Sequence, residues 1–112
     1  MNKRHLSEFR GGWIIGSFTP SLEVVTELEV CLKRYSFGEK EPLHHQREAT
    51  EYTLVISGTC RIGNLEVGPN EIVCIPPGEA ADFEALEDVV LVAIKSPSLP
   101  DDKVVGPASE VN

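Results

Sequence analysis

Short runs of β-forming residues, separated by turn residues, recur along the whole chain, and this pattern limits the fold more than any other feature. No stretch shows an apolar repeat of 3.6 residues over three turns, which a helix packed on a core would need. The pattern therefore predicts an all-β protein. The expected strands are Trp13 to Phe18, Leu28 to Tyr35, Tyr52 to Ser57, Thr59 to Ile62, Leu65 to Val67, Ile72 to Ile75, Asp82 to Ala85 and Val89 to Lys95.

Turn residues join several of these runs directly. Gly63-Asn64 separates two runs by two residues, and both residue types accept the positive φ of a tight hairpin. Gly68-Pro69-Asn70-Glu71 predicts a second turn, since Pro sets φ at the first central position and Asn tolerates the left-handed region at the next. Pro76-Pro77-Gly78 interrupts the strands again. Neighbouring runs are therefore expected to pair antiparallel.

The length of 112 residues fits a single domain. We expect a core barrel over residues 26–96, an N-terminal arm over 1–25 and a polar, proline-spaced tail over 97–112 whose end frays. Apolar residues make up 41% and charged residues 25%, which is typical of a folded globular chain. The net charge of −8 disfavours nucleic acid and anionic membrane surfaces as partners.

Cysteine use and the N-terminal residues bear on where the protein works. We expect no signal peptide or membrane span, because the basic start is not followed by a long apolar run. Cys31, Cys60 and Cys74 are odd in number and show no CxxC spacing. We interpret them as small buried residues, with a catalytic or metal-binding thiolate as the alternative. A reducing cytoplasm is the simplest location.

Side-chain alternation predicts which faces of the strands are buried. In the run from Leu28 to Tyr35, the face with Leu28, Val30 and Leu32 is apolar, so Arg34 is expected on the interior face at a pocket mouth. An ion-paired structural arginine is the alternative. The runs from Tyr52 and from Val89 are apolar on both faces, so their outer side needs cover. That cover is either the segment around Trp13 or a second subunit, and we expect a homodimer.

Residues with metal-binding chemistry gather between Gly38 and Gly58. His44 and Gln46 are two residues apart, so on an extended backbone they point to the same face, and Glu51 can complete one side of a coordination shell. An imidazole with a carboxylate suits one divalent ion such as Fe²⁺, Mn²⁺, Ni²⁺ or Zn²⁺.

This segment resembles the first conserved motif of the cupin superfamily, G-x5-H-x-H-x3,4-E-x6-G. It matches at Gly38, His44, Glu51 and Gly58, with Gln46 in place of the second histidine. The resemblance implies an antiparallel double-stranded β-helix, also called a jelly roll or cupin barrel, with a metal site at its mouth. It also implies that enzymes and binding proteins are equally open, because the superfamily contains both.

A second cupin motif, G-x5-P-x-G-x2-H-x3-N, is similar to the stretch from Gly68 to Gly78, with seven residues in place of five before the proline. Ala81 stands where this motif has its fourth ligand histidine. Asp82 is a replacement carboxylate only if a bulge re-aims it. His45 is expected to face away from His44 as a surface or interface residue, or to take the vacant ligand place if this region is a loop. The resemblance therefore implies a set of His44, Gln46, Glu51 and Asp82 that holds metal weakly or not at all.

The leading hypothesis is a cupin that binds a small polar metabolite at the barrel mouth through Arg34, His44, Glu51 and Tyr52. Glu51 as a buried structural carboxylate and Tyr52 as a core residue are the alternatives. The rival function is a metal-dependent enzyme of the dioxygenase or sugar isomerase type. Metal-free acid and base catalysis by His44 and Glu51, as in sugar epimerases, is a third hypothesis, although no clear His-Asp dyad supports it.

Overall fold

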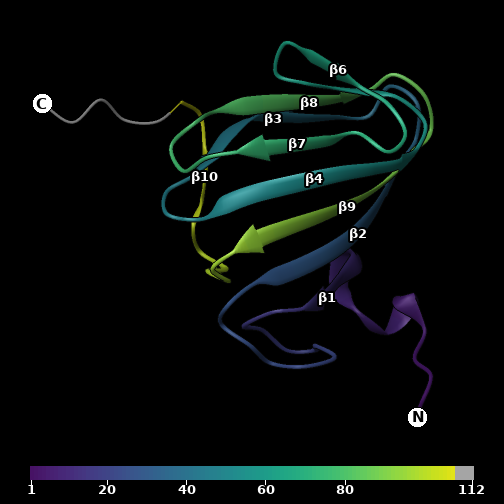
Figure 1. Ribbon diagram of the computed structural model, residues 1–112, viewed down its shortest axis with the longest axis vertical. Helices are drawn as coiled ribbons and strands as arrows, with labels where there is room; N and C mark the ends of the chain where they lie inside the picture. Colours follow the sequence, from purple (N-terminus) through teal and green to yellow (C-terminus); the bar gives the residue numbers. More distant parts are fainter. Residues whose placement is uncertain (108–112) are drawn as a thin grey trace, which may run out of the picture.

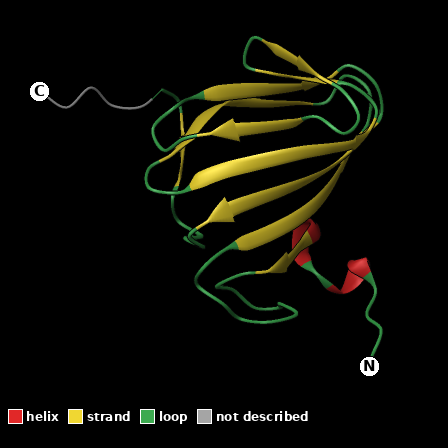
Figure 2. Cartoon of the chain, viewed as in Figure 1, coloured by secondary structure: helices red, strands yellow, loops and turns green. Residues whose placement is uncertain are grey.

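The chain folds into two facing β-sheets (Figure 1, Figure 2). The computed structural model describes residues 1–107. Two short 3₁₀ helices come first, η1 (Leu6–Glu8) and η2 (Arg10–Gly12). The strands within the described residues are β1 (Trp13–Ile15), β2 (Glu29–Tyr35), β3 (Lys40–Gln46), β4 (Thr50–Ser57), β5 (Cys60–Ile62), β6 (Leu65–Val67), β7 (Ile72–Ile75), β8 (Ala81–Ala85), β9 (Val89–Ser96) and β10 (Lys103–Val105).

The two sheets have the strand orders β1-β2-β9-β4-β7 and β10-β3-β8-β5-β6. All the pairs of these strands are antiparallel. Strands far apart in the sequence lie side by side, as β2 and β9 do in Figure 1. This arrangement confirms the predicted all-β, antiparallel double-stranded β-helix.

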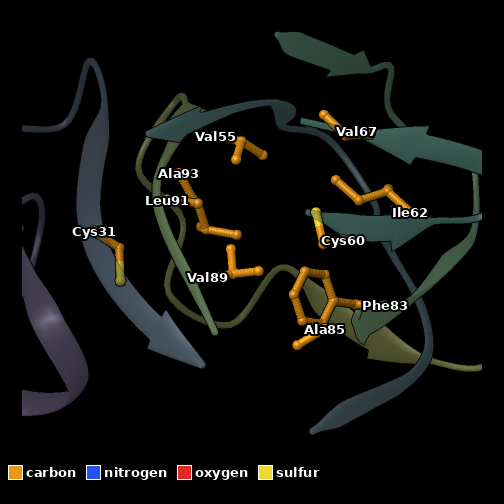
Figure 3. Close-up of a cluster of buried hydrophobic side chains, with 10 residues drawn as sticks. All are labelled: Cys31, Val55, Cys60, Ile62, Val67, Phe83, Ala85, Val89, Leu91 and Ala93. Carbon is orange, nitrogen blue, oxygen red and sulfur yellow. The ribbon is translucent and has the colours of Figure 1, made fainter. Parts of the chain in front are cut away.

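The apolar core fills one end of the barrel, and polar residues lie at the other end. Val89 and Leu91 at the start of β9 face the interior beside Val55 of β4, within the cluster drawn in Figure 3. The same inward face of β9 ends at Lys95, which pairs in register with Glu51 at the start of β4. The alternation of strand side chains therefore places a charged layer above the apolar layer.

Strand β2 faces the interior with the opposite phase to the one predicted. Glu29 and Cys31 are buried and Arg34 is exposed, so the prediction that Arg34 lies on the interior face is wrong. The prediction took the more apolar face as the inner one. In the folded chain the inner face of β2 carries Cys31, Lys33 and Tyr35, because this part of the barrel is lined by polar groups.

The turns agree with the sequence analysis. Ile62 pairs with Leu65 across Gly63-Asn64, so the predicted hairpin is confirmed. In the second turn Asn70 has φ 70°, and the amide of Glu71 donates to the carbonyl of Gly68 at 3.1 Å. Gly58, the last residue of the first cupin-like motif, has φ +79°, and a Cβ there would lie 2.0 Å from the carbonyl oxygen of Asp88. Only glycine fits this position.

Two strands were absent from the sequence prediction. One is β3. Its polar residues show no regular alternation in the sequence, and a bulge interrupts its pairing with β8. The other is β10, which lies in the predicted tail and pairs with β3. Asp102 secures this segment, since its carboxylate accepts hydrogen bonds from the amides of Glu48 and Ala49 at 2.9 to 3.1 Å. The predicted fraying concerns residues 108–112, which lie outside the described residues.

The outer face of the first sheet is apolar and is not covered by the arm. Tyr52 and Ile56 of β4 and Ile72 of β7 are exposed there, and Val92 of β9 lies between them and β2. The segment around Trp13 extends the edge of this sheet beside β2 instead. The arm is therefore not the cover that the sequence suggests, and the second subunit stays a prediction. None of the helices in residues 1–107 is long and apolar enough to span a bilayer.

The cysteines divide into two groups. Cys31 and Cys60 are fully buried, as predicted, and burial raises the pKa of each thiol to about 11. Cys74 is exposed on the outer face of β7, so the prediction of burial is wrong for this residue. The error follows from β7 being an edge strand whose outer face is uncovered.

Candidate functional site

A cavity of about 60 Å³ lies at the polar end of the barrel, and we call it the barrel cavity. The first sheet contributes polar side chains from its inner face, and the second sheet contributes the end of β3 and the start of β8. Its principal polar residues are Lys33, Tyr35, Glu41, His44, Gln46, Glu51, Thr53 and Lys95. The antiparallel register brings these residues together from strands that are distant in the sequence.

All four predicted metal ligands, His44, Gln46, Glu51 and Asp82, line this cavity. The carboxylate of Asp82, however, is already engaged, because it accepts two hydrogen bonds from Arg61, at 2.8 and 3.1 Å. These hydrogen bonds hold the pKa of Asp82 below its usual range. The bulge lies on β3 and not on β8, so Asp82 is not re-aimed and its prediction as a ligand is wrong.

The remaining donors do not fit a tightly held transition metal. Ala81 pairs in register with His44, so the position opposite the imidazole offers no donor atom. Within residues 1–107, no group of three His, Cys, Asp or Glu side chains is placed to share an ion. The ammonium of Lys95, which pairs in register with Glu51, adds a positive charge beside the carboxylate. One imidazole, one carboxylate and an amide beside an ammonium are a poor site for a divalent cation.

Two of the predicted ligand-binding residues do not reach the cavity. Arg34 is exposed on the outer face of β2. Tyr52 lies between the inward-facing Glu51 and Thr53, so its ring is on the outer face of β4, where it is 41% exposed. Both assignments to a binding site at the barrel mouth are therefore corrected. The two remaining residues, His44 and Glu51, line the cavity, and each side chain makes one hydrogen bond within the described residues. The carbonyl of Pro42 lies 2.9 Å from His44 Nδ1, and the hydroxyl of Thr53 donates to Glu51 at 3.3 Å.

Lys95 is the residue of the site that sequence reasoning missed. Its cross-strand neighbours are Glu29 on β2 and Glu51 on β4, and its ammonium lies 5.0 Å from the centre of the Trp13 ring. Only 9% of the residue is exposed, and burial lowers its pKa. One signal in the sequence points to it, because Lys95 is in phase with Val89 and the other buried residues of β9.

A second charged group crosses the cavity from β2 to β3. The ammonium of Lys33 lies 3.7 Å from the carboxylate of Glu41. The hydroxyl of Tyr35 also interacts with Glu41, and burial is the main cause of the raised pKa of this phenol. The Tyr35 ring packs against Phe83, with 4.4 Å between the ring centres. Tyr35 is therefore a neutral hydrogen-bonding group that closes the cavity toward the apolar core.

Gln46 and His45 are both buried at the end of β3. The ring of His45 donates through Nδ1 to the carbonyl of Gly106 at 3.0 Å, so this residue ties β3 to the C-terminal segment. His45 is also among the residues that line the barrel cavity and is 7% exposed, so the prediction of a surface residue is wrong. Gln46 is 4% exposed and lines the barrel cavity, and its amide nitrogen, Nε2, has no hydrogen-bond partner among the described residues.

Comparisons with known proteins agree with this architecture. Neither a protein-family model nor a curated protein sequence matches the chain. An uncharacterized conserved protein with a double-stranded beta-helix domain from Klebsiella pneumoniae superposes with a TM-score of 0.67 at 16% identity, covering 76% of this chain and 74% of that one. KdgF from Halomonas sp. has a TM-score of 0.64 at 17% identity, covering 69% and 76%.

A third solved structure, the bacterial pirin YhhW from Escherichia coli in complex with nickel(II), has a TM-score of 0.65 at 18% identity and covers 78% of this chain and 39% of that chain. These structures share the fold and little sequence. The predicted resemblance to the cupin superfamily is therefore confirmed at the level of the fold.

Proposed function

We propose that the protein binds a small polar metabolite in the barrel cavity and that binding does not require a metal ion. The observation that carries this proposal is the amide nitrogen of Gln46, which is buried, lines the cavity and has no protein partner in residues 1–107. A buried polar group without a hydrogen bond costs about 1–3 kcal/mol. A ligand that accepts a hydrogen bond from Gln46 removes this cost.

The size of the cavity limits the ligand. Pockets for drug-sized molecules enclose roughly 300–1,000 Å³, whereas the barrel cavity has about 60 Å³. A ligand that enters it therefore has only a few non-hydrogen atoms, or inserts only one functional group. The hydroxyl of Thr53 and the carboxylate of Glu51 stand on the opposite wall as further hydrogen-bonding groups.

The alternative is a metal-dependent enzyme with an ion held by His44, Gln46 and Glu51. The nickel(II) complex of the bacterial pirin is the observation in its favour, because that protein has the same fold. Against it stand Ala81 opposite His44 and the ammonium of Lys95 beside Glu51. The leading proposal needs no such ion.

A thermal-shift screen tests the proposal. The purified, untagged protein is heated with single compounds from a set of small acids, amides, polyols and amines, and at least one class is expected to raise the melting temperature. A Gln46→Leu variant should lose that increase. If no compound of any class stabilises the wild-type protein, the proposal fails.

Elemental analysis separates the two functions. It is run on protein prepared without chelator, beside a His44→Ala variant. Near-stoichiometric metal in the wild type that is lost in the variant would support the enzyme. An empty wild type that gains no stability from added Fe²⁺, Mn²⁺, Ni²⁺ or Zn²⁺ would support the binding protein.

A further inference from the structure

Two hydrogen-bond donors at the barrel cavity have no hydrogen-bonded or ion-paired partner among the described residues. One is the amide nitrogen of Gln46, which is fully buried. The other is the ammonium of Lys95, because no carboxylate oxygen of residues 1–107 lies within 4.0 Å of it and its residue is 91% buried. Unpaired donors in a cavity require a ligand that accepts hydrogen bonds.

The carboxylates beside Lys95 are already engaged. Glu29 accepts a hydrogen bond from the amide of Leu99 at 3.1 Å and lies 3.5 Å from the hydroxyl of Ser98. Glu51 accepts one from Thr53. Burial lowers the pKa of Lys95, and the charges of Glu51 and Glu29 oppose this effect without occupying the hydrogen-bonding positions of the ammonium. The Trp13 ring, 5.0 Å away, adds a favourable contact.

Positive charge also gathers at the opening of the cavity. A cleft beside it is lined by Arg10, Lys33, Lys95 and Lys103, with Glu29 as its only acidic side chain. Lys103 pairs in register with Gln46, so this charge stands next to the free amide. Four basic side chains at one place are unusual in a chain whose net charge is −8. Such a cluster attracts small anions and opposes cations.

We propose that the ligand of the barrel cavity is a small carboxylate, which pairs with the ammonium of Lys95 and accepts a hydrogen bond from Gln46, so that a lysine supplies the positive charge in a cupin barrel. This inference rests on the proposed function and specifies its ligand. A single negative charge matches the buried ammonium of Lys95, which has no carboxylate oxygen of residues 1–107 within 4.0 Å. A dianion such as phosphate is disfavoured, because Glu41 and Glu51 line the same cavity and repel the second charge.

Gln46 provides a direct signal for the test, since it is the only glutamine in the sequence. Its side-chain NH₂ resonances are assigned in a ¹H–¹⁵N NMR spectrum as the glutamine pair that is lost in Gln46→Leu. The ¹⁵N-labelled full chain is then titrated with acetate, propionate and lactate, first without EDTA and then with it. Acetamide and glycerol serve as neutral probes, and phosphate serves as the dianionic probe.

The expected result is a saturable shift of the Gln46 side-chain resonances with at least one carboxylate, and binding at least tenfold weaker for acetamide and phosphate. Lys95→Met should weaken carboxylate binding at least tenfold. Lys40→Met is the matched control, because Lys40 is an exposed lysine outside the cavity, and its affinity should equal that of the wild type.

Several results would overturn the inference. Equal affinity for acetate and acetamide would remove the role of charge, and tighter binding of phosphate would assign the site to inorganic anions. Loss of carboxylate binding on adding EDTA would show that a metal is needed. Saturable shifts with glycerol but with no carboxylate would leave the proposed function standing and refute the carboxylate. If Lys95→Met does not fold, Lys95→Gln replaces it, and unchanged carboxylate affinity in either folded variant refutes the pairing.

Discussion

Replacing Gln46 by leucine is expected to stabilise the protein in the absence of ligand. The substitution keeps a side chain of similar size at a position that is 4% exposed. It removes an amide nitrogen that has no hydrogen-bond partner in residues 1–107. Most substitutions in a protein interior destabilise it. An increase in stability here would identify Gln46 as a residue kept for binding, because function is the usual reason to retain an unfavourable buried group.

The magnitude follows from the cost of the unpaired group. Leaving a buried donor without a partner costs about 1–3 kcal/mol. Leucine removes this cost, while imperfect packing of its branched end offsets part of the gain, usually by less than about 1.5 kcal/mol. We therefore expect the free energy of unfolding to rise by about 1 kcal/mol. For a domain of this length that corresponds to an increase of about 4 °C in Tm.

Equilibrium unfolding in urea, followed by the fluorescence of the single tryptophan, Trp13, measures the change. Thr53→Val is the control, because its buried hydroxyl donates to Glu51 at 3.3 Å and the substitution deletes a hydrogen bond that exists. That variant should lose about 0.5–1.5 kcal/mol. If Gln46→Leu loses 1 kcal/mol or more, the amide has a partner in the free protein and the reasoning is refuted.

Three further predictions concern the rest of the fold. Iodoacetamide at pH 8 should label the exposed Cys74 and leave Cys31 and Cys60 unmodified, because burial raises the pKa of both of these thiols to about 11 and few thiolates form. Mass spectrometry of the native protein measures the labelling. Early modification of Cys31 or Cys60 would contradict the prediction. Asp102→Ala should lower the free energy of unfolding by about 1.5–3 kcal/mol, since the carboxylate accepts hydrogen bonds from two backbone amides. Unfolding in urea measures this loss. A loss below about 0.5 kcal/mol would indicate that water bonds to the two amides as well as the carboxylate does. We propose that a second copy of the chain covers the apolar part of the outer face of the first sheet, around Tyr52, Ile56, Ile72 and Val92, because a two-fold axis places an apolar face on its own copy. Light scattering should then give the mass of a dimer for the wild type and of a monomer for Val92→Arg. A monomeric wild type at micromolar concentration would reject the dimer.

Local rules were sufficient for much of the fold. A two-residue loop of Gly63-Asn64 can join its flanking runs in few ways, so the hairpin was predicted correctly. Position 58 must be glycine, because its φ is positive and a Cβ would collide with the Asp88 carbonyl. This requirement explains why the motif that ends at Gly58 was a correct guide to the fold. Strand alternation also placed His44 and Gln46 together at the cavity, because residues two apart on a strand share a face.

The choice of the inner face required the tertiary structure. Alternation along β2 separates its residues into two sets, but it does not say which set faces the barrel, and the set with Arg34 is the outer one. The reason is that the strands packed against this sheet decide which of its faces is the inner one, and these strands are distant in the sequence. The barrel interior is polar at one end, where Lys33 and Lys95 lie, and the outer face is apolar.

The amino-acid sequence by itself determined the strands with strong β-propensity, the tight turns and the retained donors His44 and Glu51, since each depends on residues close in the chain. Only the tertiary structure decided that Lys95 stands between Glu29 and Glu51, because that row is assembled from β2, β9 and β4 by pairing over long sequence distances. The metal-ligand motif, which lacks its last histidine at Ala81, thereby contributes to a cavity that is also lined by the ammonium of Lys95 and by the Gln46 amide nitrogen, which has no partner in residues 1–107.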